Sequence, residues 1–316
     1  MIIVKFTSGL GNQMFQYNLY NMLLNRFPQV EVKADITWFD QFAEHQGFEL
    51  CKLFKRDDNK DFVFNIASAS DIFKCTGQFH SKPGSKNAEL VNRILRYPNR
   101  VLRLFNFHTI NRKRIDQTGF EDNTEIFNQI EKIDPKFNYY ITGFFIEEIY
   151  YKNRLSAIRS CLKFDENYSD GNRNYVNQIN NSNAVSIHVR RGDYLSDTYK
   201  SSFLSLPMEY YEKAVEIAKE KLQNPVFYIF SDDKEYVKTA FAFIDKKVII
   251  EGNDGDNSFR DLQLMSLCKI NITANSTFST WAGLLNASKD AIVIYPSMYM
   301  NQKNSEEKTI PGWIRI

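Results

Sequence analysis

The chain has 316 residues, enough for two domains, and its 43% hydrophobic and 15% aromatic content can supply packed cores. A net charge of +2 gives no global argument for a nucleic-acid partner, and four widely spaced cysteines without a C-x-x-C pair argue against a disulfide framework or a zinc site. No segment approaches the roughly 20 apolar residues of a membrane-spanning helix, and the apolar run at the N-terminus is too short for a signal peptide. We therefore expect a folded cytoplasmic protein without a nucleic-acid partner.

The N-terminus predicts a β-loop-α-β unit. Residues 2–6 are an apolar strand, residues 7–13 a glycine-containing loop, and residues 30–34 a second strand that ends at Asp35. Between them, four apolar residues fall on one helical face: Phe15, Leu19, Met22 and Leu23. The loop sequence SGLGN can bring backbone N–H groups close to a ligand, or it is a plain tight turn.

A basic segment follows at residues 82–114, with nine lysines and arginines against one acid, Glu89. Apolar residues are interleaved with these cations, and Pro98 divides the segment into two expected helices. One interpretation is a pair of amphipathic helices on the core. The other is a peripheral contact with an anionic membrane on its cytoplasmic face.

Two further segments concern the domain organisation. Residues 139–151, YYITGFFIEEIYY, are dense in aromatics and favour core packing over the lining of a cleft. Residues 165–183 are polar and rich in asparagine, which makes them the best candidate for a linker. We therefore expect an N-terminal domain over residues 1–165 and a C-terminal domain over residues 166–316.

The C-terminal half predicts an α/β fold with a doubly wound parallel sheet. Apolar strands are expected at residues 184–189, 226–230, 248–250, 270–273 and 291–295. Four amphipathic helices alternate with them, and parallel strands need crossover helices of this length. The turns that follow the strands, HVRRGD, FSDD, EGNDGD and NSTFS, should therefore gather at one edge of the sheet, where such sheets bind ligands.

The gathered turns carry the residue types that bind a diphosphate. Arg190 and Arg191 are fixed cations that can grip phosphate oxygens in a fork, and Ser276 and Thr277 lie where a helix begins. In the alternative, the arginines pair with Asp193 or Asp232 and Ser276 is only a helix cap. The D-G-D sequence at residues 254–256 has the spacing of a metal-binding motif but also the composition of an ordinary turn, and we expect no metal.

Four motifs occur along the chain in the order SGLGNQMFQY, HVRRGDY, YIFSDD and NSTFSTWAGLLN. Together they resemble the α-1,2-fucosyltransferases of glycosyltransferase family 11, and they span nearly the full chain. The short chain without an N-terminal anchor is similar to bacterial rather than Golgi members. The resemblance implies a GT-B-like fold in which two Rossmann-like domains face a cleft, with GDP-L-fucose held by the C-terminal half and the acceptor by the N-terminal half.

The resemblance also implies an inverting transfer of L-fucose from GDP-β-L-fucose to the 2-hydroxyl of a terminal galactose, in surface glycan or O-antigen synthesis, without a metal or other cofactor. In the H-x-R-R-x-D pattern, Arg190 would stabilise the leaving diphosphate. By analogy with protein O-fucosyltransferases, Gly11 and Asn12 would face the reacting centre. Residues 276–278 resemble the turn that binds the phosphate and base, and an acidic residue upstream of it, Asp256 or Asp261, would read guanine. The full set implied to bind the donor is Gly11, His188, Arg191, Asp256, Asp261, Ser276, Thr277 and Phe278.

The general base stays open at the level of sequence. Asp193 and His188 are the nearest candidates in sequence to Arg190, although Asp193 is equally suited to orienting Arg191. Three carboxylates of the N-terminal half are further candidates: Asp35, Glu147 and Glu148. If GDP departs before the acceptor attacks, a strong base is unnecessary.

Two other classes of function compete with this one. The tripeptide R-G-D at residues 191–193 occurs in adhesion proteins, but its place directly after a core strand argues against an exposed loop tip. The second class is a GT-B enzyme for another nucleotide sugar, or a nucleotide-binding protein without transferase activity. Release of GDP from GDP-fucose would separate an enzyme from a pure binding protein.

Overall fold

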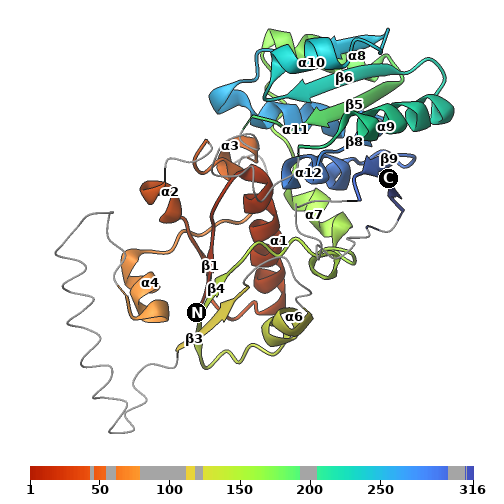
Figure 1. Ribbon diagram of the computed structural model, residues 1–316. Helices are drawn as coiled ribbons and strands as arrows, with labels where there is room; N and C mark the ends of the chain where they lie inside the picture. The colour runs from red at the N-terminus through yellow and green to blue at the C-terminus, as the bar shows by residue number, and fades with distance from the viewer. Residues whose placement is uncertain are drawn as a thin grey trace, which may run out of the picture. The chain divides into compact units, whose positions relative to one another are not determined.

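The computed structural model divides the chain into two compact units, each of which is described by itself (Figure 1). The first unit comprises Met1–Leu50 and Arg56–Arg154, and the second comprises Cys51–Lys55 and Leu155–Ile316. Asp193 and most of the basic segment 82–114 lie outside the residues that the structure describes. The described residues are 1–42, 46–54, 62–78, 112–117, 124–192, 205–297, 310 and 312–316.

The first unit contains a four-stranded parallel sheet with the strand order β2-β1-β4-β3. Its elements are β1 (Ile2–Lys5), α1 (Leu10–Arg26), β2 (Val32–Asp35), α2 (Trp38–Gln41), α4 (Ala69–Thr76), β3 (Arg112–Asp116), α6 (Thr124–Glu131), β4 (Asn138–Thr142) and the 3-10 helix η1 (Glu148–Tyr150). The end of the basic segment, residues 112–114, therefore lies in an edge strand and not in a helix. Charged residues are common in edge strands, because they discourage pairing with another chain.

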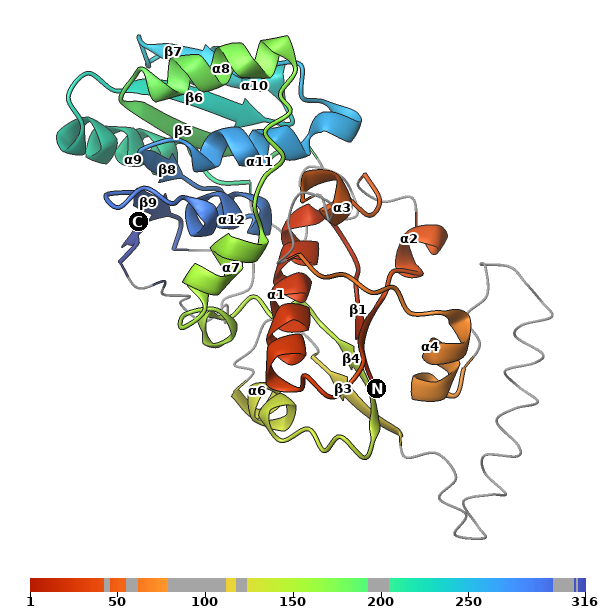
Figure 2. The same cartoon turned by 180° about the vertical axis from the view of Figure 1, so that it is seen from behind.

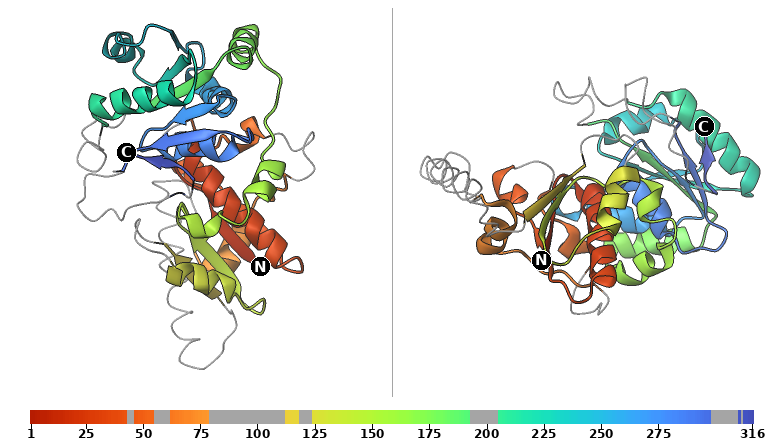
Figure 3. Two further views of the ribbon diagram at one scale, coloured as in Figure 1. Left: turned by 90° about the vertical axis from the view of Figure 1, so that its right-hand side faces the viewer. Right: turned by 90° about the horizontal axis from the view of Figure 1, so that it is seen from below.

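Helices cover both faces of this sheet. Helix α4 lies on one side of β1 and β4 and helix α1 on the other, as the two views in Figures 1 and 3 show. On the α4 side, the buried side chains of Ile72 and Cys75 pack against Ile3 and Tyr140 of the strands. Aromatic residues of the segment 139–151 are also buried, among them Tyr150 and Tyr151, so this segment contributes to the core as expected.

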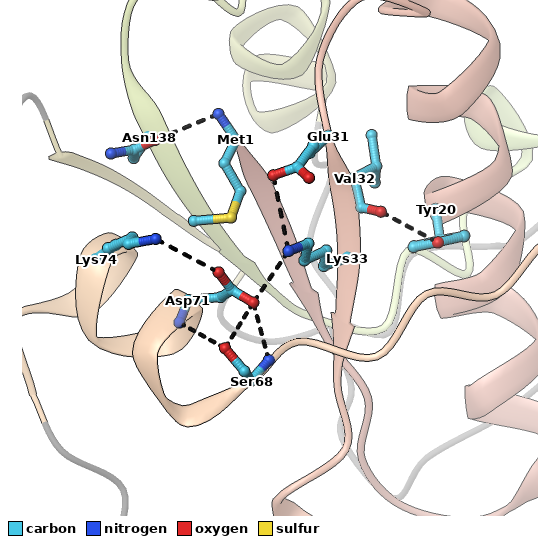
Figure 4. Close-up of polar contacts among 9 residues, drawn as sticks. All are labelled: Met1, Tyr20, Glu31, Val32, Lys33, Ser68, Asp71, Lys74 and Asn138. Carbon is cyan, nitrogen blue, oxygen red and sulfur yellow. Dashed lines mark hydrogen bonds and ion pairs between the residues drawn. The ribbon is translucent and has the colours of Figure 1, made fainter.

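A polar cluster fastens α4 to the sheet (Figure 4). The carboxylate of Asp71 accepts hydrogen bonds from the backbone and hydroxyl of Ser68, which caps the helix, and from the ammonium group of Lys33 on β2 at 3.0 Å. Burial alone would raise the pKa of Asp71, but these donors outweigh it and lower the pKa to about 2. Asp71 is therefore ionised at neutral pH and joins two elements.

The second unit contains a six-stranded parallel sheet with the order β10-β9-β8-β5-β6-β7. Its strands are β5 (Ala184–Val189), β6 (Val226–Ser231), β7 (Lys247–Ile249), β8 (Ile270–Ile272), β9 (Ile292–Tyr295) and β10 (Ile314–Arg315). Its helices are α3 (Leu50–Leu53, whose first residue belongs to the first unit), α7 (Leu155–Cys161), α8 (Asp170–Asn180), α9 (Met208–Lys221), α10 (Lys234–Ala240), η3 (Gly255–Asn257), α11 (Phe259–Ser266) and α12 (Thr277–Leu285). The parallel sheet expected for the C-terminal half is confirmed, and β10 adds a sixth strand to the five expected.

Alternate residues of β5 face two different helix layers. Val185 and Ile187 pack into an apolar core with α9 and α10. On the other face, the hydroxyl of Ser186 accepts a hydrogen bond from Asn271, whose amide also donates to the carbonyl of Met265 in α11. Figure 2 shows α8 and α11 on the near side of β5 and β6. The sheet is therefore doubly wound, as the alternation of strands and helices predicts.

The expected linker at residues 165–183 is mostly a helix. Ser169 caps α8, and its hydroxyl accepts a hydrogen bond from the backbone N–H of Asn172 at 3.3 Å. Asparagine has a low helix propensity, but a capped start and a buried Ile179 stabilise the helix in its tertiary context. The prediction of a linker there was wrong because it relied on composition alone.

No helix of the described residues is long and apolar enough to span a bilayer.

Candidate functional site

The candidate site of the second unit lies at the carboxyl ends of its strands. From β5, the chain order runs through β6 and β7 in one direction, and then through β8, β9 and β10 in the other. The order therefore reverses between β5 and β8, and the crevice at such a switch point is where open parallel sheets bind ligands. Residues that follow β5 and β8 line this switch point.

Arg190 directly follows β5 and forms an ion pair with Asp232, which directly follows β6. Nη1 of Arg190 lies 3.1 Å from Oδ2 of Asp232. The other oxygen, Oδ1, accepts hydrogen bonds from the backbone N–H groups of Arg191 at 2.9 Å and Gly192 at 3.1 Å. A single carboxylate thus contacts both the side chain of the first arginine and the backbone of the turn.

Arg191 is held by the start of α10. Its Nε donates to Oδ2 of Asp233 at 3.2 Å, and its guanidinium carbon lies 3.9 Å from the centre of the Tyr236 ring. Asp233 is also the cap of α10, because its carboxylate accepts from the backbone N–H of Tyr236. The pairing of both arginines with acidic residues, which the sequence left as the alternative, is therefore observed, with Asp232 and Asp233 as the partners.

His188 is buried at the end of β5, and its ring centre lies 5.6 Å from that of Phe278 in the first turn of α12. Burial, and secondarily the charge of Arg190, lower the pKa of His188 to about 3, so the imidazole is neutral at physiological pH. Its Nδ1 has no hydrogen-bond partner among the described residues. A group with so low a pKa is a poor general base, but its unpartnered nitrogen can bind a ligand.

Ser276 and Thr277 lie at the beginning of α12, in the turn that follows the carboxyl end of β8. The hydroxyl of Ser276 accepts from the backbone N–H of Phe278 at 3.3 Å, so Ser276 is indeed a helix cap. Capping and anion binding are compatible, because the first turn of a helix offers several N–H groups. The structure thus brings the turn after β8 and the end of β5 to the same switch point.

The two acidic residues expected to read guanine lie in different environments. Asp261, in the first turn of α11, is half-buried, and its carboxylate accepts a hydrogen bond from the side chain of Asn253 at 2.8 Å. Burial raises the pKa of Asp261 to about 7, although the bond from Asn253 opposes this rise. The side chain of Asp256 is 84% exposed and pairs with Lys52, which lowers its pKa, so Asp261 has the more ligand-like environment.

The D-G-D turn shows the features of an ordinary surface turn. Asp254 pairs with Lys234 at 2.6 Å, and Asp256 pairs with Lys52 at 2.7 Å. Among the residues that the structure describes, no group of three or more histidine, cysteine, aspartate or glutamate side chains is arranged to hold a metal ion.

In the first unit, the loop expected over residues 7–13 is shorter than predicted. Helix α1 begins at Leu10, so Gly11 and Asn12 lie in its first turn. The side chain of Gln13 fastens this turn by donating to the carbonyl oxygens of Ser8 and Gly47, both at 2.9 Å. Asn12 is half-buried, and its side chain makes no hydrogen bond to any other described residue. Its amide can therefore bind a ligand without breaking an existing contact.

Two of the three carboxylates of the first unit that were candidate bases, Asp35 and Glu147, are engaged in structural contacts, while Glu148 begins the 3-10 helix η1. Asp35 is fully buried, with hydrogen bonds from Thr37 to one oxygen and from the hydroxyl of Tyr140 to the other. Glu147 accepts a hydrogen bond from Gln117. Because a general base must reach the proton that it removes, the burial of Asp35 favours a structural role.

Sequence reasoning missed Tyr236 and Asn253, and it treated Asp233 only as part of a turn. The signal for Tyr236 was present, because an aspartate three residues before it at the start of a helix predicts a cap. No comparable signal existed for Asn253, since its contacts to Asn172 and Asp261 depend on tertiary structure.

A parallel sheet with helices on both faces and an arginine at its switch point is the architecture of an α/β protein that binds nucleotides. The profile of one family, described as Glycosyl transferase family 11, matches residues 1–316. The chain belongs to this family and is a glycosyltransferase. The resemblance drawn from the four motifs is thereby confirmed.

Individual relatives agree with this assignment. The chain is 28% identical to the O-antigen biosynthesis glycosyltransferase WbnK of Escherichia coli over 98% of each chain. It is also 28% identical to an alpha-1,2-colitosyltransferase of Escherichia coli, over 100% of this chain and 99% of the other. The galactoside alpha-(1,2)-fucosyltransferase 2 of Rattus norvegicus is 27% identical over 45% of this chain and 42% of its own length.

Among solved structures, the fucosyltransferase NodZ from Bradyrhizobium matches with a TM-score of 0.50 at 14% identity, over 90% of this chain and 91% of the other. At this identity the likeness shows the fold alone. Two parallel α/β sheets, as in fucosyltransferases of the GT-B type, confirm the fold class expected from the sequence.

Proposed function

We propose that this family 11 enzyme transfers L-fucose from GDP-β-L-fucose to the 2-hydroxyl of a terminal galactose, with inversion at the anomeric carbon. The carrying observation is the position of Arg190, which follows β5 at the switch point of a parallel sheet, in a chain that matches the family over its full length. The relatives named for O-antigen biosynthesis and for galactoside α-(1,2)-fucosyl transfer support a surface glycan as the product.

In the proposed reaction, the bond between the anomeric carbon and the diphosphate breaks, and a bond from that carbon to the acceptor oxygen forms. Negative charge develops on the departing GDP, where Arg190 and the first turn of α12, with Ser276 and Thr277, stabilise it. These groups supply positive charge at the diphosphate, and we propose a transfer that does not depend on a metal. The neutral His188 and the ring of Phe278 contact the donor next to this position.

We assign recognition of guanine to Asp261, because its carboxylate is half-buried and held by Asn253. Arg191 is assigned to fixing the turn, because its guanidinium is engaged by Asp233 and Tyr236. The donor is assigned to the C-terminal unit. The acceptor is assigned to the N-terminal unit, in which Gly11 and Asn12 of the first turn of α1 are assigned to the reacting centre.

Proton removal from the acceptor completes the reaction. Asp193 stays the candidate base from sequence and lies outside the described residues. If GDP leaves first, positive charge on the fucosyl group lowers the demand on the base, and the proton can pass to solvent.

Incubation with GDP-fucose and a panel of β-galactosides, followed by linkage analysis, tests the proposal. An α-1,2-fucosylated product is expected, and absence of both transfer and GDP release would overturn it. A second candidate donor is nucleotide-activated colitose, because a full-length relative is an alpha-1,2-colitosyltransferase. Competition between the two donors at equal concentration decides which sugar the enzyme prefers.

A further inference from the structure

The register of the second sheet places Asp232 beside Arg190. Strands β5 and β6 pair in parallel with Val189 opposite Ser231, so the residues that follow the two strands lie next to each other at the carboxyl edge of the sheet. These next residues are Arg190 and Asp232, and they form the 3.1 Å ion pair. The pairing is therefore built into the sheet and does not depend on a long surface side chain finding a partner.

The carboxylate of Asp232 is itself held in a fixed orientation. Its Oδ1 accepts from two consecutive backbone N–H groups, those of Arg191 and Gly192. A Cβ at Gly192 would lie 3.3 Å from Cγ of Asp232, so the absence of a side chain there allows this close approach. With Oδ1 fixed by the backbone, Oδ2 points at Nη1 of Arg190.

The turn has a second, separate anchor. Arg191 is bound by Asp233 and by the face of the Tyr236 ring, so the backbone after β5 is fastened to α10 without any contribution from Oδ2 of Asp232. The contact between Oδ2 and Arg190 therefore acts on the side chain of Arg190. A guanidinium carries five N–H donors in one plane, so a carboxylate at Nη1 restricts the directions in which the other donors can point.

We propose that Asp232 is a positioning residue that orients the guanidinium of Arg190 toward the leaving diphosphate. This inference rests on the proposed function, because it presupposes that Arg190 contacts the diphosphate. Asp232 itself touches neither donor nor acceptor in this role. Its contribution passes entirely through Arg190, and this dependence is what an experiment can measure.

Asp232→Asn is the informative variant. Its amide oxygen can still accept from the two backbone N–H groups, but its amide nitrogen then faces Nη1 of Arg190, donor against donor. The matched control is Glu235→Gln, which removes one negative charge from the first turn of α10. Glu235 pairs only with the exposed Lys238 in the described contacts, and its side chain is 86% exposed. We expect the control to have unchanged activity.

The test is a double-mutant cycle with Arg190→Lys, in which kcat and the KM for GDP-fucose are measured for each protein. Asp232→Asn alone should lower kcat about 10-fold, since it removes a charge-assisted hydrogen bond, and Arg190→Lys should lower it about 100-fold. The double variant should be no slower than Arg190→Lys, because Asp232 has no guanidinium left to orient. Thermal unfolding of each variant checks that the fold is retained; if Asp232→Asn does not fold, Asp232→Glu takes its place.

Two results would overturn the positioning role alone: Asp232→Asn with wild-type kcat, or equal fold losses from Asp232→Asn in both backgrounds. A different result would refute the proposed function, namely a wild-type protein that neither releases GDP from the donor nor binds GDP in calorimetry. Full activity of the Arg190→Lys variant would rule out the leaving-group role of Arg190, and with it the positioning role of Asp232.

Discussion

The pH dependence of GDP binding tests the assignment of Asp261. This carboxyl group is half-buried, and burial raises its pKa to about 7. Guanine presents N–H donors on its Watson–Crick edge, which an ionised carboxylate accepts and a protonated one accepts poorly. GDP should therefore bind more tightly as the pH rises through 7. If only the ionised form binds well, about a tenth of the molecules are competent at pH 6 and about nine tenths at pH 8, so Kd should fall about 10-fold.

Other groups at the same sheet edge do not obscure this range. The pKa of His188 is about 3, so its imidazole stays neutral from pH 6 to 8, and arginines stay charged. The terminal phosphate of GDP also titrates near neutral pH, and a matched variant corrects for it. Asp261→Asn binds the same nucleotide without the carboxyl group, so the difference between the two proteins reports Asp261.

Isothermal titration calorimetry of GDP with both proteins at pH 6, 7 and 8 measures this difference. We expect wild-type binding to strengthen with pH more than Asp261→Asn binding does, and we expect inosine diphosphate, which lacks the 2-amino group, to depend less on pH. Equal pH profiles for the two proteins, or wild-type affinity in Asp261→Asn at pH 8, would refute the assignment of Asp261 to guanine.

Three further predictions concern stability and membranes. Asp71→Asn should lower the free energy of unfolding at pH 7 by about 1 kcal/mol in urea titration, since it removes the charge that pairs with Lys33, whose ammonium group is partly screened by solvent. The difference in unfolding free energy between wild type and variant should shrink as the pH falls below about 4, toward the pKa of about 2 that Asp71 has in the folded protein. The stability that comes from a lowered pKa is lost when the carboxylate is protonated. A difference that stays constant with pH would contradict this role of Asp71. Gly283→Ala should lower the melting temperature, because the added Cβ would lie 2.9 Å from the Trp313 ring. The cost of this overpacking should outweigh the gain of about 1 kcal/mol in helix propensity. An unchanged or higher melting temperature would contradict this prediction. If residues 82–114 contact a membrane, binding to anionic vesicles should weaken with salt, and equal binding to neutral vesicles would rule this contact out.

Much of the C-terminal half was predictable from sequence because its signals are local. Apolar runs such as residues 184–189 and 226–230 alternate with amphipathic helices, and only a parallel sheet with crossovers accommodates this order. The same reasoning placed Arg190 and Ser276 at one edge of the sheet. The structure confirms this fold, and α12 begins at Thr277.

The N-terminal half was less predictable because its signals are not local. The edge strand β3 contains Arg112, Lys113 and Arg114, and these charges resemble the end of a basic helix. The same difficulty occurs in the second unit, where the polar residues of α8 resemble a linker. In both segments the state of the backbone depends on neighbours that are distant in sequence, such as β4 for β3.

The sequence by itself determined the family, the doubly wound sheet and the positions of the candidate residues along the chain, because motif order and hydrophobic periodicity are properties of the linear chain. Only the tertiary structure decided which acidic residue meets which arginine. The register of β5 and β6 pairs Arg190 with Asp232, and the start of α10 pairs Arg191 with Asp233. Burial likewise makes the imidazole of His188 neutral and raises the pKa of Asp261, since desolvation depends on what packs around a group and not on its neighbours in sequence.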